Sequence, residues 1–193
     1  MRKILFIIDA QNDFCHKDGS LTCENSEKAV KNILVMLANN GFDKIVCTQD
    51  RHGQDYMNTI EGKHLPIWHC MEGNWGEKIR KEIYMALYEQ NCDWILITKN
   101  TFMLKHETIE EELENCIGEW EVYICGFATD ICVINNALLL KQFFPLSEIN
   151  LIKNCCAGTS VEMHNKAIDI MAINHINILG EYHNSDNKED NND

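Results

Sequence analysis

Several motifs that mark common classes of enzyme are absent from this chain of 193 residues. The first apolar run is followed by DAQNDFCHKDG, which has no glycine before Gly19 and therefore no GxGxxG dinucleotide fingerprint. The chain contains neither a GxxxxGKS/T phosphate loop nor a GxSxG nucleophile elbow. After Cys132, the run CVINNALLLK has no arginine that could clamp a phosphate. Dinucleotide-binding folds of the usual kind, P-loop enzymes, nucleophile-elbow hydrolases and cysteine phosphatases are therefore not indicated.

Long apolar runs and an excess of basic residues are absent as well. No apolar stretch is long enough to span a bilayer, and the opening MRKILFIIDAQNDF turns acidic where a signal peptide would end in small residues. We therefore expect a cytoplasmic protein without a membrane partner. Lysine and arginine number 17 against 30 acidic residues, which gives a formal net charge of −13. This balance argues against a nucleic-acid partner.

Cysteine is abundant, with ten residues, but the patterns that would bind structural zinc are missing. There is no CxxC pair, and the adjacent Cys155 and Cys156 do not form one, so a zinc ribbon is not indicated. A chain of this length without a signal peptide is also not typical of a disulfide scaffold. We expect reduced thiols.

The length suits one domain with a sizeable core, and no Pro- or Gly-rich linker divides it. We expect this domain to occupy residues 1–180. The end of the chain, EYHNSDNKEDNND (181–193), is polar, acidic and aperiodic, and it is predicted to be a disordered tail.

Short apolar runs alternate with segments of helical periodicity. The runs predict strands at 3–8, 43–48, 93–98, 120–125, 148–152 and 175–179, and the periodic segments predict helices at 26–39, 75–90, 107–116, 130–143 and 161–173. Strands that are apolar on both faces and separated by helices are typical of a parallel sheet covered on both sides. We predict an α/β fold of three α/β/α layers with a six-stranded, mostly parallel, Rossmann-type sheet. The long irregular stretch 50–74 is a candidate functional loop.

Polar side chains follow the predicted strands at the edge where such sheets bind ligands. The first strand ends in Asp9, the second in Asp50 and His52, the third in Lys99, and the fourth leads to Cys132. Taken singly, each residue is more often a solvated surface group than a catalytic one. An acid, a base and a thiol at corresponding strand ends indicate a catalytic site.

Cys132 lies in ICGFATDICV (124–133), where a strand gives way to a helix. A thiol in the first turn of a helix feels the positive end of the helix dipole, which favours the thiolate. The alternative is that Cys132 is one more buried small hydrophobe, the usual fate of a free cysteine.

The 50–74 loop holds a second group of polar residues, which comprises Asp50, His52, Glu61, His64 and His69. Histidine and carboxylate ligands suit Zn²⁺, Fe²⁺ or Mn²⁺. The alternative is a set of scattered loop histidines that bind no metal.

Five motifs in this order resemble the isochorismatase-like cysteine hydrolases, and within them the nicotinamidase branch. They are DxQNDF…GSL near the start, DxH after the second strand, EG…LP…HC in the long loop, KxTF after the third strand, and GxxTDxCV. The resemblance extends from FIIDAQNDFCHKDGSL to INHINILG and excludes the tail. It implies the same six-stranded parallel fold.

The resemblance also implies catalytic roles. Cys132 would be the nucleophile, Asp9 the general acid and base, and Lys99 their cationic neighbour. A cis peptide joining Phe127 to Ala128 would let the backbone N–H groups of Ala128 and Cys132 bind the oxyanion.

For the metal, the resemblance implies the ligands Asp50, His52 and His69, with Glu61 rather than His64 as the fourth. Zinc is the first expectation, and iron and manganese are alternatives. The implied pocket for the substrate ring is lined by Phe14, Trp68, Phe102 and Phe127. The chain departs from the family at Pro66, where an aromatic residue is common, and in NTFMLKHE after Lys99, and both departures concern this pocket.

The expected activity is hydrolysis of nicotinamide to nicotinate and ammonia through a cysteine thioester, which feeds NAD salvage. The first alternative is a related cysteine amidase that acts on another small amide, such as an N-carbamoyl or ureido compound. A true isochorismatase, which needs neither the thiol nor the DxH…H set, and a non-catalytic scaffold are weaker alternatives. The family includes dimers and tetramers, so a homo-oligomer is a further expectation.

Overall fold

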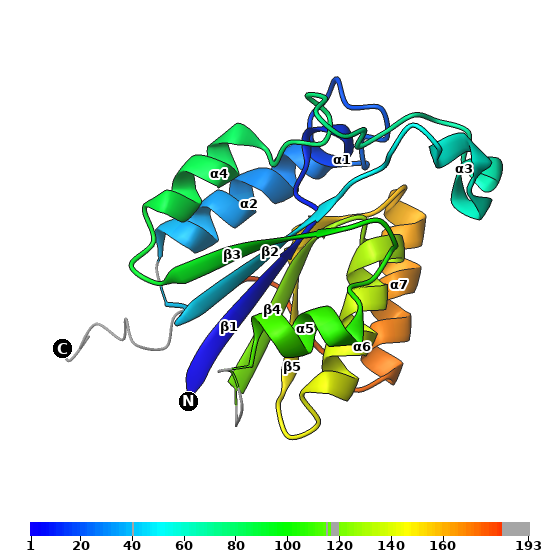
Figure 1. Ribbon diagram of the computed structural model, residues 1–193. Helices are drawn as coiled ribbons and strands as arrows, with labels where there is room; N and C mark the ends of the chain where they lie inside the picture. The colour runs from blue at the N-terminus through cyan, green and yellow to red at the C-terminus, as the bar shows by residue number, and fades with distance from the viewer. Residues whose placement is uncertain (40, 115, 117–119, 183–193) are drawn as a thin grey trace.

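The computed structural model describes residues 1–39, 41–114, 116 and 120–182. Its centre is a six-stranded sheet with the order β3-β2-β1-β4-β5-β6, in which every pair of neighbouring strands is parallel (Figure 1). The strands are β1 (Arg2–Ile8), β2 (Lys44–Asp50), β3 (Asp93–Lys99), β4 (Trp120–Phe127), β5 (Ile149–Ala157) and β6 (Asn177–Leu179). The predicted fold class and all six predicted strands are confirmed.

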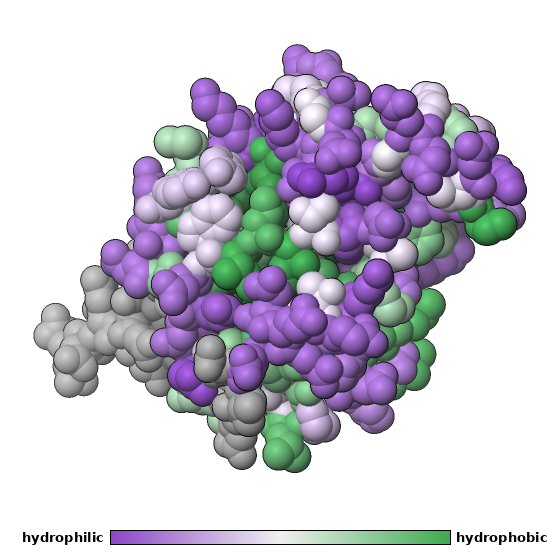
Figure 2. All heavy atoms as spheres, in the orientation of Figure 1, coloured by the Kyte–Doolittle hydropathy of each residue, from purple (hydrophilic) through white to green (hydrophobic). Residues whose placement is uncertain are grey.

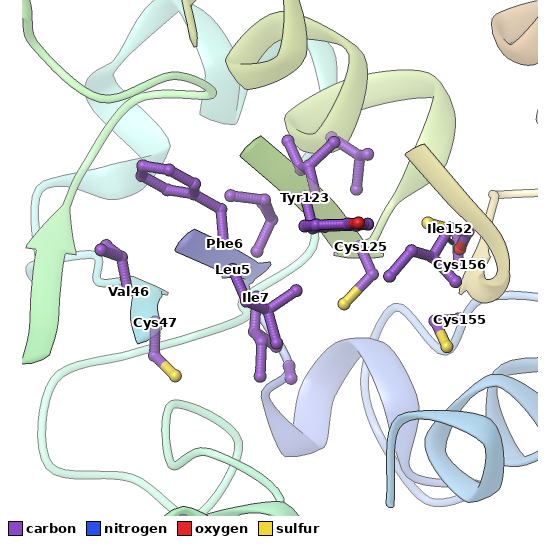
Figure 3. Close-up of a cluster of buried hydrophobic side chains, with 14 of the residues drawn as sticks. Leu5, Phe6, Ile7, Val46, Cys47, Tyr123, Cys125, Ile152, Cys155 and Cys156 are labelled. Carbon is purple, nitrogen blue, oxygen red and sulfur yellow. Dashed lines mark hydrogen bonds between the residues drawn. The ribbon is translucent and has the colours of Figure 1, made fainter. Parts of the chain in front are cut away.

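The apolar runs form strands because both faces of the sheet are covered. Figure 3 shows Phe6 and Val46 on one side of the sheet and their chain neighbours Ile7 and Cys47 on the other. All four side chains are buried. A strand in such a sheet needs apolar residues at consecutive positions rather than at alternate ones.

Helices cover both faces of the sheet (Figure 1). Helices α2 (Ser26–Ala38) and α4 (Lys81–Tyr88) lie on one face, and α5 (His106–Glu112), α6 (Ile134–Phe143) and α7 (Val161–Ile173) lie on the other. The short helices α1 (Asn12–Cys15), η1 (Tyr56–Asn58) and α3 (Ile60–His64) lie beyond the carboxyl ends of the strands. The last two belong to the 50–74 loop.

The strand order places a topological switch point between β1 and β4. From β1 the chain proceeds outward through β2 to β3, and it then crosses to β4 and proceeds outward in the opposite direction. The loops that follow β1 and β4 therefore leave the sheet side by side and in opposite senses, which opens a crevice at the carboxyl ends of the strands.

One predicted helix, 75–90, is wrong in its first part because α4 begins only at Lys81. Residues 76–80 instead run beside residues 10–13, with hydrogen bonds from the Asp13 N–H to the Gly76 carbonyl and from the Arg80 N–H to the Ala10 carbonyl. This long-range pairing satisfies backbone groups that a helix would have satisfied locally.

The ten cysteines are all free, and nine of them are buried, as expected for reduced thiols. No helix of the described residues combines the length and the apolar character that a membrane span requires. Of the predicted tail, residues 183–193 lie outside the described chain, whereas Tyr182 is buried against Phe42 and Tyr123.

The edge strand β3 exposes part of its apolar surface. Figure 2 shows apolar side chains in the middle of this face, where β3 lies between α4 and α5. Leu96 on β3 is 39% exposed, whereas Ile4 at the centre of the sheet is fully buried. The outer strand β3 is therefore less well covered than the central strand β1.

Candidate active site and metal cluster

Four strands deliver polar side chains to one crevice. Asp9 follows β1, Asp50 and Lys99 are the last residues of β2 and β3, and Cys132 lies in the turn after β4. Asp50 and Lys99 are paired in the β2–β3 register. The predicted convergence at the carboxyl ends of the strands is therefore present in the fold.

Lys99 lies at the centre of this group. Its Nζ atom is 2.6 Å from Asp9 Oδ2, 3.9 Å from Cys132 Sγ and 3.7 Å from Asp50 Oδ1. The exposed fractions of Asp9, Cys132 and Lys99 are 0%, 5% and 8%. An acid, a cation and a thiol thus share a site from which water is largely excluded, where charges interact strongly.

Burial controls the protonation of these groups. It is the largest influence on the pKa of Asp9, which is raised although Lys99 opposes the shift. It also raises the pKa of the Cys132 thiol well above its ordinary value, and the nearby Asp9 carboxylate adds to this effect. Burial lowers the pKa of Lys99, but Asp9, Cys132 and Asp50 raise it more, so Lys99 stays cationic.

Burial of Cys132 therefore opposes the thiolate that its position in the first turn of a helix favours. Cys132 rests as a thiol beside a carboxylate whose pKa is also raised. Such a pair is suited to transfer of a proton from the thiol to the carboxylate when sulfur attacks an electrophile.

Thr48, which the sequence reasoning missed, orients Asp9. The backbone of Asp9 has a φ of +47°, which breaks the ladder between β1 and β2. The Thr48 hydroxyl accepts a hydrogen bond from the Asp9 N–H at 3.1 Å and donates one to Asp9 Oδ1 at 2.6 Å. A threonine inside a strand carries no local signal of this role.

Cys132 lies in a tight turn. The peptide bond between Phe127 and Ala128 is cis, as the resemblance implied. Residues Thr129–Val133 then form a single π-helical turn, which the Val133 N–H closes on the Ala128 carbonyl at 3.0 Å. Such turns are frequent at functional sites.

Gly126 is required before this turn. Its φ is +125°, and a Cβ atom at this position would lie 2.0 Å from the Ile8 carbonyl oxygen. Only glycine allows β4 to leave the sheet this close to the end of β1.

A second group lies beside the first and comprises Asp50, His52, Glu61 and His69. Each offers one ligand atom, and these atoms all lie within 4.8 Å of one another. Nε2 of His52 is 2.9 Å from Asp50 Oδ2 and 3.6 Å from Glu61 Oε1. His64, the alternative to Glu61, is exposed.

The residues of this group fit a divalent metal ion. His69 Nδ1 lies 2.9 Å from the Ile67 carbonyl oxygen, so Nδ1 carries the proton and Nε2 is left free to coordinate. His52 Nε2 lies 2.9 Å from Asp50 Oδ2, and Asp50 Oδ1 lies 3.7 Å from Lys99 Nζ. Neither His52 Nε2 nor Asp50 Oδ1, however, makes a hydrogen bond of good geometry within the described residues. Unsatisfied buried atoms are costly, and a metal ion bound by two imidazoles and two carboxylates would satisfy them.

Gln11 holds the backbone of Asp50. Its side-chain amide donates to the Asp50 carbonyl at 2.7 Å and to the Glu77 carbonyl at 2.7 Å, and it accepts from the Asp50 N–H at 2.8 Å. The β1–β2 backbone pairing ends before Asp9. Beyond that point the Gln11 side-chain amide forms the hydrogen bonds to the Asp50 backbone that a continued strand would have formed. The position of Gln11 in the DxQNDF motif was the only signal in the sequence for this role. The motif does not indicate the hydrogen-bond partners of Gln11, which lie far away along the chain.

Asp13 has a similar role for the histidine side of the group. Its buried carboxylate accepts hydrogen bonds from the Cys70 N–H at 2.7 Å and from the Ser20 N–H at 3.0 Å. Cys70 directly follows His69 and has a φ of +46°. Asp13 therefore joins the first loop to the end of the long loop that carries His69.

The four predicted pocket residues differ in their surroundings. The ring of Phe14 is buried with its centroid 5.8 Å from that of His69, whereas Trp68 is 47% exposed and contacts Tyr56 at 6.0 Å. Phe102 is 43% exposed, and Phe127 is fully buried. Tyr56, which was not predicted, packs on both histidines, with centroids 4.5 Å from His52 and 5.0 Å from His69.

Comparison with known proteins identifies the class to which this fold and site belong. The model of the isochorismatase domain matches residues 3–180. The chain therefore belongs to the isochorismatase family and is a hydrolase of that family.

Individual relatives are nicotinamidases and pyrazinamidases. A nicotinamidase of Schizosaccharomyces pombe is 24% identical over 193 residues, which cover 85% of this chain and 86% of the relative. The crystal structure of a nicotinamidase/pyrazinamidase from Bacillus subtilis superposes with a TM-score of 0.79 at 22% identity, covering 93% of this chain and 100% of that one. A pyrazinamidase of Pyrococcus horikoshii, solved in complex with zinc, gives a TM-score of 0.72 at 19% identity, covering 94% of this chain and 100% of that one.

Proposed function

We propose that the protein hydrolyses nicotinamide to nicotinate and ammonia, with Cys132 as the nucleophile. The observation that carries the proposal is the buried group in which Lys99 contacts both Asp9 and Cys132. The adjoining ligand cluster and the nicotinamidases among the relatives support this substrate. Release of nicotinate would supply NAD salvage.

In the first half of the reaction, Asp9 takes the proton of the Cys132 thiol as sulfur attacks the amide carbon. The electron pair of the C=O bond moves to oxygen, and the backbone N–H groups of Ala128 and Cys132 stabilise the oxyanion. One such donor typically contributes about 3 kcal/mol to the stability of the transition state. The oxyanion then re-forms the carbonyl, the C–N bond breaks, and Asp9 returns the proton to the departing nitrogen. Ammonia and a thioester result.

In the second half, water attacks the thioester carbon and Asp9 takes a proton from that water. The C–S bond breaks as the carbonyl re-forms, and Cys132 recovers its proton from Asp9. The products are the carboxylic acid and the free thiol. Throughout, the Lys99 ammonium stabilises the anions that form on sulfur and on Asp9.

Asp50, His52, Glu61 and His69 would hold a divalent ion, with zinc preferred and iron or manganese as alternatives. When bound, the ion supplies an open coordination position that can hold the ring nitrogen of the substrate. Phe14 packs on His69 and Phe127 precedes the oxyanion turn, so we assign them to opposite ends of the ring pocket. Trp68 and Phe102, which are more exposed, would complete its rim.

Hydrolysis of three amides tests the substrate. Nicotinamide and pyrazinamide both carry a ring nitrogen meta to the amide, whereas benzamide has the same shape without the nitrogen. We expect ammonia release from the first two and a rate on benzamide that is lower by about 100-fold or more, because a site that binds a substrate atom rejects analogues that lack it. Removal of metal with a chelator should erase most of this difference by disabling the good substrates.

Cys132→Ala is the background control for each substrate. Equal rates on benzamide and nicotinamide would contradict the role of the ring nitrogen. If none of the three amides is hydrolysed, the activity is that of a cysteine amidase for another class of small amide.

A further inference from the structure

We propose that His164, a residue outside the catalytic group, is a positioning residue for the nucleophile turn. It acts as part of a turn clasp, which consists of Thr129 and Asp130 in the turn, Thr159 in the loop before α7, and His164 in the first turns of α7. The inference deepens the proposed function, on which it rests, because the turn matters for catalysis only if Cys132 is the nucleophile.

The first contact of the turn clasp joins Thr129 to His164. Thr129 Oγ1 lies 2.8 Å from His164 Nδ1. The Thr129 side chain is fully buried, so this hydroxyl has no access to water, and loss of the histidine nitrogen would leave it without this partner. A buried polar group without a partner costs about 1–3 kcal/mol, which is enough to shift a short turn.

The second contact joins Asp130 to the loop between β5 and α7. Asp130 Oδ1 accepts from the Thr159 N–H at 2.8 Å, and Oδ2 accepts from the Thr159 hydroxyl at 2.6 Å. A side chain at Gly158 would place a Cβ atom 2.6 Å from Asp130 Oδ1 and 3.0 Å from His164. The loop therefore approaches the turn as closely as a glycine allows.

The position of the clasped residues links them to catalysis. Thr129 and Asp130 lie between Ala128 and Cys132, the two residues whose N–H groups would bind the oxyanion. The far end of the turn is held separately, because the Asn136 side chain donates to the Cys132 carbonyl at 2.8 Å. The turn clasp thus fixes one end of the oxyanion site and Asn136 fixes the other. A displacement of about 1 Å in such a site can lower a rate by about 100-fold.

Two substitutions of His164 separate positioning from general packing. The side-chain amide of asparagine places a nitrogen or oxygen near the position of His Nδ1, whereas the longer amide of glutamine matches Nε2. His164→Asn should therefore keep the contact with Thr129, and His164→Gln should lose it. Lys166→Gln is the matched control, because Lys166 is an exposed residue of the same helix.

We expect His164→Gln to lower kcat by about 10- to 100-fold with little change in KM, because the turn acts on the transition state more than on the bound amide. His164→Asn should retain most of the wild-type kcat. In a double-mutant cycle, Thr129→Val with His164→Gln should be no worse than either single change, since both remove the same contact.

Pyridine-3-carbaldehyde provides a probe of the oxyanion site. Its carbon forms a bond with Cys132 Sγ, the C=O electron pair moves to oxygen, and that oxygen lies where the oxyanion would form, with the thiol proton passing to Asp9 or to the oxygen. Nicotinate cannot form this adduct. His164→Gln should bind the aldehyde about 10- to 100-fold more weakly than the wild type and bind nicotinate equally well.

Hydrogen exchange of residues 126–133, measured by mass spectrometry, tests the clasp without any substrate. His164→Gln should speed exchange in this segment, whereas His164→Asn and Lys166→Gln should not. The proposal would be overturned if exchange in this segment were unchanged in His164→Gln. It would also be overturned if His164→Asn and His164→Gln lost the same amount of kcat and both had a lower Tm, because that result indicates a general packing role. If the wild type does not hydrolyse nicotinamide but hydrogen exchange in the turn responds to the substitutions as expected, the proposed function is refuted. The turn clasp would then have a structural role only.

Discussion

Replacing Thr48 with valine should shift the acid limb of the pH profile to higher pH. The change keeps the shape of the side chain but removes the hydroxyl that donates to Asp9 Oδ1 at 2.6 Å. A hydrogen bond to a charged group contributes about 1.5–3 kcal/mol, and Asp9 is fully buried, so water cannot replace the lost donor. The ionised form of Asp9 should become less favourable by about 10- to 100-fold, since 1.4 kcal/mol corresponds to a factor of ten.

The direction of the shift follows from the proposed role of Asp9 as a base. Burial raises the pKa of Asp9, and the Thr48 hydrogen bond is one of the contacts that oppose this. Activity requires the ionised carboxylate and is lost as the pH falls through the Asp9 pKa. Thr48→Val raises this pKa further, so activity should be lost at a higher pH than in the wild type.

The assay is kcat/KM for nicotinamide as a function of pH, with Thr98→Val as the control because Thr98 is an exposed threonine on the neighbouring β3. Thr48→Val also leaves the buried Asp9 N–H without its acceptor, which should cost about 1–3 kcal/mol of folding stability. If Thr48→Val shows this loss of stability but its acid limb superimposes on that of the wild type, Asp9 is not the base.

Cys132→Ala should abolish ammonia release without changing the fold. Cys125→Ala, in the core of β4, should remain active and lose roughly 0.5–3 kcal/mol of stability in denaturant unfolding. Comparable activity in Cys132→Ala and the wild type would exclude a covalent mechanism. Asp9→Asn should lose turnover but retain stoichiometric metal by elemental analysis, and His52→Ala should lose the metal. A metal-free Asp9→Asn protein would show that the two groups are wrongly assigned. Gln11→Leu should weaken zinc binding by about 10- to 100-fold in a competition titration with a chromophoric chelator, because residues that support metal ligands contribute that much to metal affinity. An unchanged zinc affinity would show that the Gln11 amide does not support the metal site.

The linear sequence determined the fold class because burial on both faces imposes a pattern on each segment separately. The run KILFII, for example, has apolar residues at consecutive positions, which is typical of a strand in a sheet that is covered on both faces. Parallel strands in turn place their carboxyl ends at one edge, so the residues that follow each strand could be collected into one site without coordinates. Asp9, Asp50, Lys99 and Cys132 were grouped on this ground. Glu61 and His69 were noted in the loop, and the resemblance to a known family then implied that they bind the metal.

Only the tertiary structure decided which residues support that site and how its groups are charged. The partners of Thr48, Gln11 and Thr129 lie between 35 and 66 residues away along the chain, and no local periodicity records such distances. The helix α4 begins later than the periodicity predicted for the same reason, because residues 76–80 form hydrogen bonds with the loop that follows β1. The protonation of Cys132 also depends on burial, which is a property of the packed chain. The position at a helix N-terminus favours a thiolate, whereas the loss of water around the sulfur raises the pKa of the thiol.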